Sequence, residues 1–124
     1  MDFELNEQEV MTRDCAREFA TKRLAPLAAE LDAKQEFPAW LVKELAGLGL
    51  MGIPVPEKWG GGGMSNVAYS VAVEELSRGC ASVGVTVSAH TSLACDPLMK
   101  YGTDAQRRSS SSPWPPARSS EPWP

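Results

Sequence analysis

The sequence predicts an all-α fold, a bundle of four main helices in an orthogonal or antiparallel arrangement. Three observations lead to this prediction: apolar residues recur at helical spacing, capping residues precede the periodic segments, and glycine or proline separates them. At 124 residues the chain is one domain at most, with a modest core. We place the helical domain at residues 1–106 and a disordered Ser/Pro/Trp-rich tail at residues 107–124.

The first helix is predicted to begin at a capping box. Asn6 can accept a hydrogen bond from the first turn, and Glu9 can return one. Pro26 is expected to interrupt or kink the helix, and a short helical continuation follows over residues 27–35. The pattern is amphipathic, and its buried stripe is predicted to consist of Met11, Cys15, Ala16, Phe19 and Ala20.

A second helix is predicted within residues 37–50. Pro38 suits its first turn, and Gly47 and Gly49 can end it. Residues 51–65 hold two prolines and five glycines, so they are predicted to form a loop. The apolar side of the second helix is predicted to consist of Trp40, Leu41, Leu45 and Leu48.

Two further helices follow the loop. Ser65 can cap the third, which ends near Gly79. The fourth is predicted over Ala81–Tyr101, with Gly102 at its C-terminal end. Only Asp96 is charged in its first eighteen residues, and a helix that is apolar or small on every side is usually buried on every side. The fourth helix is therefore expected to be the most buried element.

Composition excludes several classes of function. The net charge is −4 with 12 Lys and Arg, so the chain lacks the basic surface of a nucleic-acid binder. Three widely spaced cysteines fit neither a disulfide framework nor a zinc site and favour buried thiols in a reducing compartment. The N-terminus resembles no signal peptide, transit peptide or membrane span, so we predict a cytoplasmic protein without a membrane partner.

Three features could indicate chemistry, and each has a simpler interpretation. His90 is the only histidine, but no cysteine or carboxylate accompanies it at motif spacing, so we interpret it as a helix residue facing a pocket or a gap in the core. The Gly60–Gly63 run lacks the Lys-Ser/Thr of a P-loop and is predicted to be a turn. Glu74 and Glu75 are adjacent, about 100° apart on a helix, and should not act as an acid/base pair; one is expected to face water or Arg78.

Three stretches, in this order, resemble the N-terminal α-helical domain of the acyl-CoA dehydrogenases. The resemblance covers residues 3–106, nearly the whole predicted domain. The stretches are the Pro-Glu-x-aromatic-Gly-Gly turn of Pro56 to Gly61, the Glu74-Glu75-Leu76 helix, and the pattern Ser92-Leu93, Pro97 and Lys100-Tyr101-Gly102.

The resemblance implies a part of a longer FAD-dependent enzyme that desaturates acyl-CoA thioesters between the α and β carbons, in fatty-acid or branched-chain acyl oxidation. In that family a β-domain and a helical C-terminal domain follow, and FAD lies mainly between them and a neighbouring subunit. A carboxylate beyond the β-domain removes the α-proton. The resemblance also implies electron-transfer flavoprotein as a partner and a homo-oligomeric state.

What the resemblance assigns to this chain is one wall of the acyl-chain pocket, formed by Thr86, Ala89, His90 and Leu93. No catalytic, cofactor-binding or metal-binding residue is expected here, and the fragment should hold no FAD and be inactive alone. The alternative is a non-enzymatic interaction module that binds a partner through its apolar fourth helix.

The last residues depart from the family pattern. Thr103 to Gln106 form a capping-box pattern, which predicts the start of a fifth helix. A serine run and five prolines follow, and these are not expected to continue a helix. Pro115 and Pro124 each follow a tryptophan, whose codon is TGG, and proline codons begin with CC. If the reading frame is shifted one base earlier, both prolines are therefore replaced by alanine (GCC), which the family continuation has at these positions. We therefore hypothesise a one-base slip near Arg108; a natural Ser/Pro-rich linker or interaction tail is the alternative.

Overall fold

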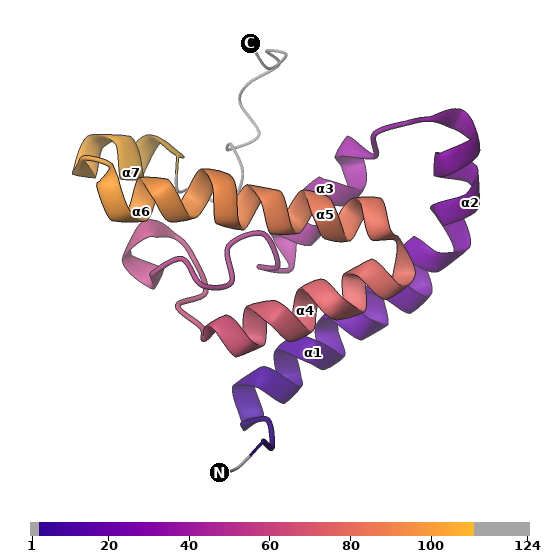
Figure 1. Ribbon diagram of the computed structural model, residues 1–124, viewed down its shortest axis with the longest axis horizontal. Coiled ribbons are helices and arrows are strands. Elements are labelled where there is room, and N and C mark those ends of the chain that lie inside the picture. The colour runs from indigo at the N-terminus through magenta and orange to yellow at the C-terminus, as the bar shows by residue number, and fades with distance from the viewer. Residues whose placement is uncertain (1–2, 111–124) are drawn as a thin grey trace.

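The computed structural model describes residues 3–110, and within them the chain forms helices and loops without a strand (Figure 1). The all-α prediction is confirmed. In chain order the elements are α1 (Glu7–Phe19), the π-helical turn η1 (Ala20–Leu24), α2 (Ala25–Lys34), α3 (Ala39–Gly47), the short 3₁₀ turn η2 (Glu57–Trp59), α4 (Asn66–Gly79), α5 (Ala81–Ala89), the π-helical turn η3 (His90–Cys95), α6 (Asp96–Tyr101) and α7 (Asp104–Ser110).

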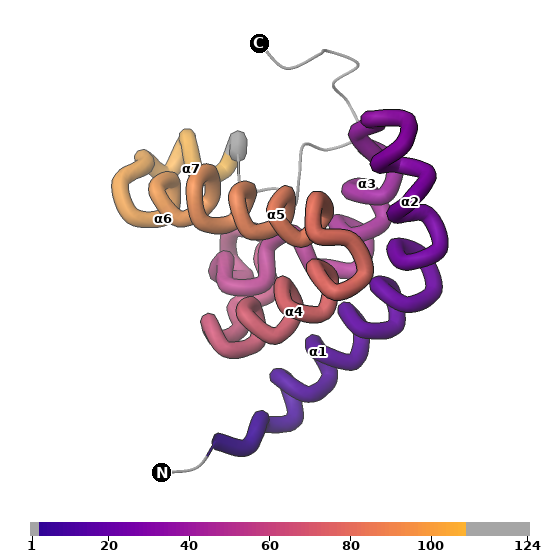
Figure 2. Tube along the Cα trace, turned by 45° about the vertical axis from the view of Figure 1, so that its right-hand side comes forward, coloured from indigo at the N-terminus to yellow at the C-terminus, as the bar shows by residue number. Residues whose placement is uncertain are grey.

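Helix α4 lies at the centre of the packing, with α1 on one side and α5 on the other (Figures 1 and 2). Helices α1 and α4 run in the same direction, since Glu9 contacts Ser65 near both N-termini and Arg17 contacts Glu75 further along. Only Cys80 separates α4 from α5, so these two helices are antiparallel. The long connection through α2, α3 and the loop returns the chain to the start of α4.

The predicted caps of α1 and α4 both form, and one side chain joins them. The Glu9 amide donates to Asn6 Oδ1 at 2.9 Å, and the Asn6 amide donates to Glu9 Oε2 at 3.0 Å. Ser65 Oγ accepts from the Ala68 amide at 3.0 Å and donates to Glu9 Oε1 at 2.8 Å. Two helix starts that are 56 residues apart in sequence thus share one hydrogen-bond network.

Replacing Ser65 by alanine is expected to lower the free energy of unfolding by about 1–2 kcal/mol, because both the cap and the link to Glu9 are lost. Ser70→Ala is the matched control on the same helix, since the exposed Ser70 hydroxyl only donates to the carbonyl of Asn66. Urea unfolding followed by circular dichroism measures both. Equal losses in the two variants would contradict the role given to Ser65.

The chain has two long continuous helices, one formed by α1, η1 and α2 and the other by α5, η3 and α6. In each, a π-helical turn comes directly before a segment that contains a proline. Turn η1 precedes Pro26 in α2, and turn η3 precedes Pro97 in α6. Proline has no amide hydrogen for the α-helical bond, and a π-turn displaces the bonding pattern by one residue. The predicted interruption at Pro26 therefore takes the form of a changed helical pitch, and the chain continues as helix.

The core lies where α1, α3, α4, α5 and the loop after α3 meet. Two residues predicted for the apolar side of the second helix are exposed instead: Trp40 in α3 at 43%, and Leu48, directly after α3, at 50%. Met11 in α1 is also wrong, at 62% exposed, and Thr12 is buried in its place, its hydroxyl donating to the carbonyl of Gln8. The largest fully buried side chains are Leu24, Leu41, Leu45, Met51, Ile53, Leu76, Val83 and Val87.

Helix α7, which corresponds to the fifth helix of the sequence prediction, begins at the predicted capping box. The Thr103 amide donates to Gln106 Oε1 at 2.9 Å, and the Gln106 amide donates to Thr103 Oγ1 at 3.3 Å. Helix α7 continues to Ser110, beyond the domain boundary predicted at residue 106. The rest of the predicted tail, residues 111–124, lies outside the described residues, as do the codon positions on which the frameshift hypothesis rests.

Candidate functional site

The four predicted wall positions share one side of the long helix formed by α5, η3 and α6. Thr86, Ala89, His90 and Leu93, here called the outer stripe, are spaced three, four and seven residues from the first. Leu93 is 76% exposed, and the other three are half-buried. The neighbouring Val85 is 65% exposed. The structure thus places the outer stripe on an accessible and largely apolar face.

The prediction that this helix is buried on every side is wrong, because only one face packs against α4. Val83, Gly84 and Val87 are the buried residues of α5. A Cβ atom at Gly84 would lie 2.0 Å from Ser77 Oγ and 2.9 Å from Ser77 Cα, so the two helices approach as closely as glycine allows. The few charged residues of this helix therefore do not mean that it is buried all round. One apolar face packs against α4, and another is exposed.

A cleft of about 450 Å³ lies beside the same helix. None of the four predicted wall positions lines it. Its walls come from the start of the loop, from α4 and from the η3–α6 segment. The lining residues are Pro54, Val55, Pro56, Asn66, Tyr69, Thr91, Ser92, Cys95, Asp96, Met99 and Lys100.

Most polar groups of the cleft are already paired. The Tyr69 hydroxyl donates to the carbonyl of Ser88 at 3.2 Å, and Asp96 lies 2.7 Å from Lys100 at the rim. Thr91 is different: its hydroxyl is buried and has no hydrogen-bond partner within residues 3–110. A buried hydroxyl without a partner is costly, so this atom marks a position where a polar ligand atom or water would be stabilised.

His90 and Cys95 meet at the side of the cleft. The distance between His90 Nε2 and Cys95 Sγ is 3.3 Å. Burial lowers the pKa of His90 and raises the pKa of Cys95, so both groups are favoured in their neutral forms. The sequence offers no cysteine at motif spacing from His90, and this contact with Cys95 was not predicted. A separation of five residues is not an α-helical contact spacing, and only the π-turn creates it.

The glycine run forms a turn, as predicted, and offers no phosphate cradle. Gly60 and Gly63 have φ of 89° and 60°, values that favour glycine. The four amides of residues 60–63 all donate within the loop, to the carbonyls of Glu57, Pro56, Gly52 and Val55 in turn. Because no amide of the run is left to face a ligand, an anion would have to break the turn in order to bind there.

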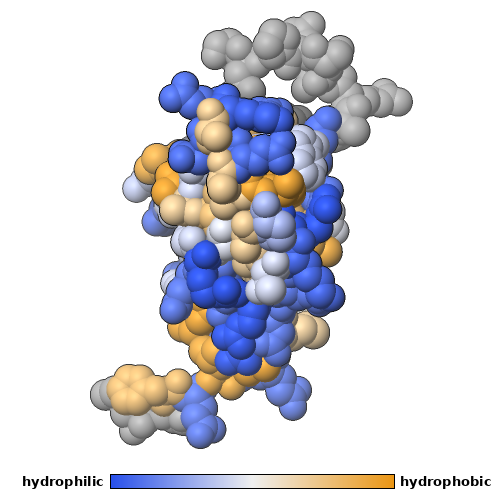
Figure 3. Space-filling view, turned by 90° about the vertical axis from the view of Figure 1, so that its right-hand side faces the viewer, coloured by the Kyte–Doolittle hydropathy of each residue, from blue (hydrophilic) through white to orange (hydrophobic). Residues whose placement is uncertain are grey.

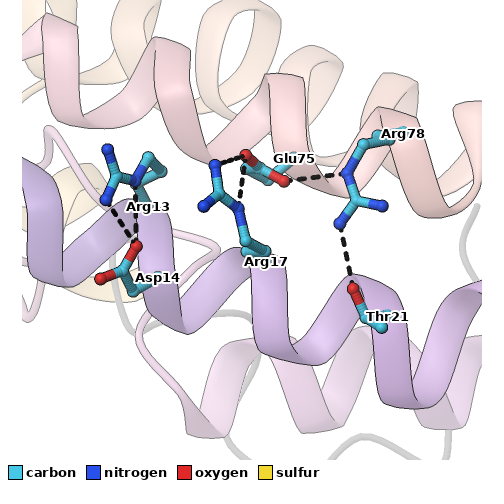
Figure 4. A network of polar contacts seen from close by, with 6 residues as sticks. All are labelled: Arg13, Asp14, Arg17, Thr21, Glu75 and Arg78. Carbon is cyan, nitrogen blue, oxygen red and sulfur yellow. Dashed lines mark hydrogen bonds and ion pairs between the residues drawn. The ribbon is translucent and has the colours of Figure 1, made fainter.

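Glu75 is a structural carboxylate rather than a catalytic one. Arg17 Nη2 lies 2.7 Å from its Oε1 and Arg78 Nε lies 3.0 Å from its Oε2 (Figure 4). The hydrogen bond from Arg17 is the main cause that lowers the pKa of Glu75, with Arg78 adding to it. Glu74 is exposed, so the two adjacent carboxylates face different surroundings, as predicted.

The described residues contain neither a cluster of metal-ligating side chains nor a membrane-spanning helix. Within residues 3–110, no group of three or more His, Cys, Asp and Glu side chains could hold a metal ion. Over the same residues, no helix has both the length and the apolar character needed to cross a membrane.

Comparison with known proteins identifies the family. A sequence model of the acyl-CoA dehydrogenase N-terminal domain matches residues 6–112. The mitochondrial short-chain specific acyl-CoA dehydrogenase of Bos taurus is 48% identical over 105 residues, which are 85% of this chain and 26% of the bovine protein. The short-chain specific acyl-CoA dehydrogenase of Clostridium acetobutylicum is 42% identical over 108 residues, covering 87% of this chain and 28% of the relative.

Solved structures agree with the sequence comparison. Butyryl-CoA dehydrogenase from Megasphaera elsdenii aligns with a TM-score of 0.85 at 35% identity, covering 91% of this chain and 31% of the other. A structure described as the electron transferring flavoprotein of Acidaminococcus fermentans aligns with a TM-score of 0.88 at 39% identity, covering 91% and 30%. The chain spans between a quarter and a third of these relatives. It belongs to the acyl-CoA dehydrogenase family and carries that family's N-terminal domain.

Proposed function

We propose that this chain is the N-terminal part of a flavin-dependent enzyme that desaturates acyl-CoA thioesters, and that its outer stripe forms one wall of the acyl-chain pocket. The observation that carries the proposal is the open face of Thr86, Ala89, His90 and Leu93 on a domain of this family. Small or apolar side chains on an accessible helix face suit contact with a hydrocarbon chain. Relatives named for short-chain and butyryl substrates favour a short acyl group.

We expect His90 to contribute less to this wall than its neighbours. Its Nε2 lies 3.3 Å from Cys95 Sγ, so this ring nitrogen already has a contact within the chain. Thr86 likewise uses its hydroxyl internally, donating to the carbonyl of Ser82 at 2.8 Å. The wall is therefore proposed to act mainly through shape and apolar contact.

Neither the glycine turn nor Glu75 offers a binding site for FAD. The glycine amides that could face a phosphate are used inside the turn, and Glu75 is held by two arginines. No step of flavin chemistry is therefore assigned to this chain. In the proposed enzyme the flavin and the proton-removing carboxylate belong to other domains, and the fragment alone is proposed to be inactive.

The wall can be tested in a chimera in which this domain replaces the N-terminal domain of the bovine relative. Ala89→Phe is expected to lower kcat/KM for butyryl-CoA more than about tenfold, because the phenyl ring takes the space of the acyl chain. Ala33→Phe is the matched control, since Ala33 is exposed on α2, whose side of the molecule is mainly hydrophilic (Figure 3).

Flavin content is measured in both chimeras to separate lost substrate fit from lost assembly. Unchanged kcat/KM and acyl-length preference in the Ala89→Phe chimera would show that the outer stripe does not line the pocket.

The same exposed face supports the alternative function, a non-enzymatic module that binds a protein partner. Val85 and Leu93 are both largely exposed and apolar, as an interaction surface would require. A stable, stoichiometric complex that contains no flavin, and that is lost in Leu93→Lys, would favour the module. Flavin-containing assembly of the chimera with thioester-dependent dye reduction would favour the enzyme.

Partners and compartment are proposed on the same basis. Acyl-CoA and electron-transfer flavoprotein are the expected partners of the whole enzyme, and the A. fermentans structure names an electron transferring flavoprotein. A homo-oligomer is likewise proposed for the whole enzyme. The cytoplasm stays a prediction from sequence, whereas the bovine relative is named as mitochondrial.

A further inference from the structure

The π-turn η3 creates a contact that an α-helix would not allow. At about 100° per residue, positions five apart on an α-helix are separated by about 140° around the axis. In a π-turn the backbone bond joins residues five apart, which brings His90 and Cys95 onto one side. Their ring nitrogen and sulfur are 3.3 Å apart, and the chain has no other histidine.

This distance is close to the span of a metal chelate. In a tetrahedral site with sulfur at about 2.3 Å and nitrogen at about 2.0 Å from the metal, the two ligand atoms lie about 3.5 Å apart. The contact between His90 and Cys95 is slightly shorter. The spacing of the two atoms is therefore within a few tenths of an ångström of what a shared ion requires.

A third soft side chain and an access route belong to the same cleft as Cys95. Met99 follows Cys95 by one helical turn, and both side chains line the cleft of about 450 Å³. The thioether of methionine is flexible and polarisable, so it can adjust to an ion bound at Cys95. Thr91 lines the same cleft, and its buried hydroxyl has no hydrogen-bond partner within residues 3–110. This is an independent indication that the cleft can hold a further polar group.

We propose that His90, Cys95 and Met99 form a binding site for a soft monovalent cation, Cu(I). A thiolate, an imidazole and a thioether are the ligands that favour Cu(I), whereas Mg²⁺ and Ca²⁺ prefer oxygen atoms. Binding replaces the thiol proton: the S–H bond of Cys95 breaks, a sulfur–copper bond forms, and the proton passes to solvent. Copper stays in the +1 state, so no oxidant or reductant is required.

The test is an anaerobic titration of the full chain with Cu(I) in competition with a chromogenic Cu(I) chelator. Wild type is expected to take up one equivalent and to release one proton. Cys95→Ser is expected to abolish this binding, and His90→Gln to weaken it more than about tenfold. Met99→Leu, which keeps the apolar volume, is expected to weaken it by a smaller factor.

The other two thiols provide the matched control. Cys15 and Cys80 are partly exposed, in contrast to the buried Cys95, and neither lines the cleft. A Cys15→Ser/Cys80→Ser double variant is therefore expected to bind Cu(I) as wild type does. Far-UV circular dichroism confirms the helical fold of each variant, and His90→Gln decides the result if Cys95→Ser does not fold.

Two results would overturn the proposal. If wild type does not compete with the chelator, the pair is only a hydrogen bond inside the helix. If His90→Gln binds as tightly as wild type, copper is held by thiols alone and the histidine is no ligand. Neither result bears on the acyl-chain wall, which the chimera tests separately.

Discussion

Gly84→Ala is expected to lower the free energy of unfolding by about 2–3 kcal/mol, although alanine is the better helix former. The added methyl group would lie 2.9 Å from both Cα and Cβ of Ser77 and 2.0 Å from its Oγ. The hydroxyl can rotate away, but the backbone of α4 cannot move without separating the packed helices. The loss should therefore exceed the gain of about 0.5–1 kcal/mol in helix propensity.

Gly47→Ala is the control for this prediction. Gly47 is the last residue of α3, and a Cβ there meets nothing within 4 Å. Alanine at this position should be neutral or stabilising by about 0.5–1 kcal/mol. Chemical denaturation of both variants measures the difference, and Ser77→Gly combined with Gly84→Ala should recover part of the loss. If Gly84→Ala is no less stable than Gly47→Ala, the close approach of α4 and α5 is not real.

Glu75→Gln is expected to cost about 1–3 kcal/mol of unfolding free energy at neutral pH, because two arginines lose their shared carboxylate. Both arginines are about half-exposed, so solvent screening favours the lower part of this range. Glu74→Gln is the matched control on the neighbouring, exposed position, where the same change should cost less than about 0.5 kcal/mol.

The pH dependence of stability distinguishes this ion pair from simple packing. The hydrogen bond from Arg17 is the largest cause of the lowered pKa of Glu75 in the folded chain. A lowered folded pKa means that the stabilisation is complete above the unfolded value of about 4.3 and is lost as pH falls through the folded value. The difference between wild type and Glu75→Gln should therefore be constant near neutral pH and shrink in acid. A difference that does not change with pH would contradict the ion pair.

Sequence patterns predicted those features that depend on residues three or four apart. The caps at Asn6, Ser65 and Thr103 are local hydrogen bonds, and all three form where expected. The ends of α4 and α6 also follow local signals, since Gly79 and Gly102 stand at or just after the last turn. Local rules suffice for such features because their partners are fixed by spacing along the chain.

Features that depend on distant contacts could not be predicted in the same way. Met11 was expected in the core, but Thr12 is buried there because its hydroxyl also reaches Met64, 52 residues away. The cleft brings Pro54 to Pro56 against residues of η3 and α6 about forty positions later. The contact of His90 with Cys95 depends on a π-turn, which helical periodicity does not reveal.

The most direct test of the central claim is a crystal structure of the chimera with a bound acyl-CoA thioester. The account predicts that the acyl carbons lie within van der Waals distance, about 4 Å, of Ala89 and Leu93 on the outer stripe. An acyl chain that lies in the cleft beside Tyr69 and Met99, or that touches no residue of α5 and η3, would contradict it.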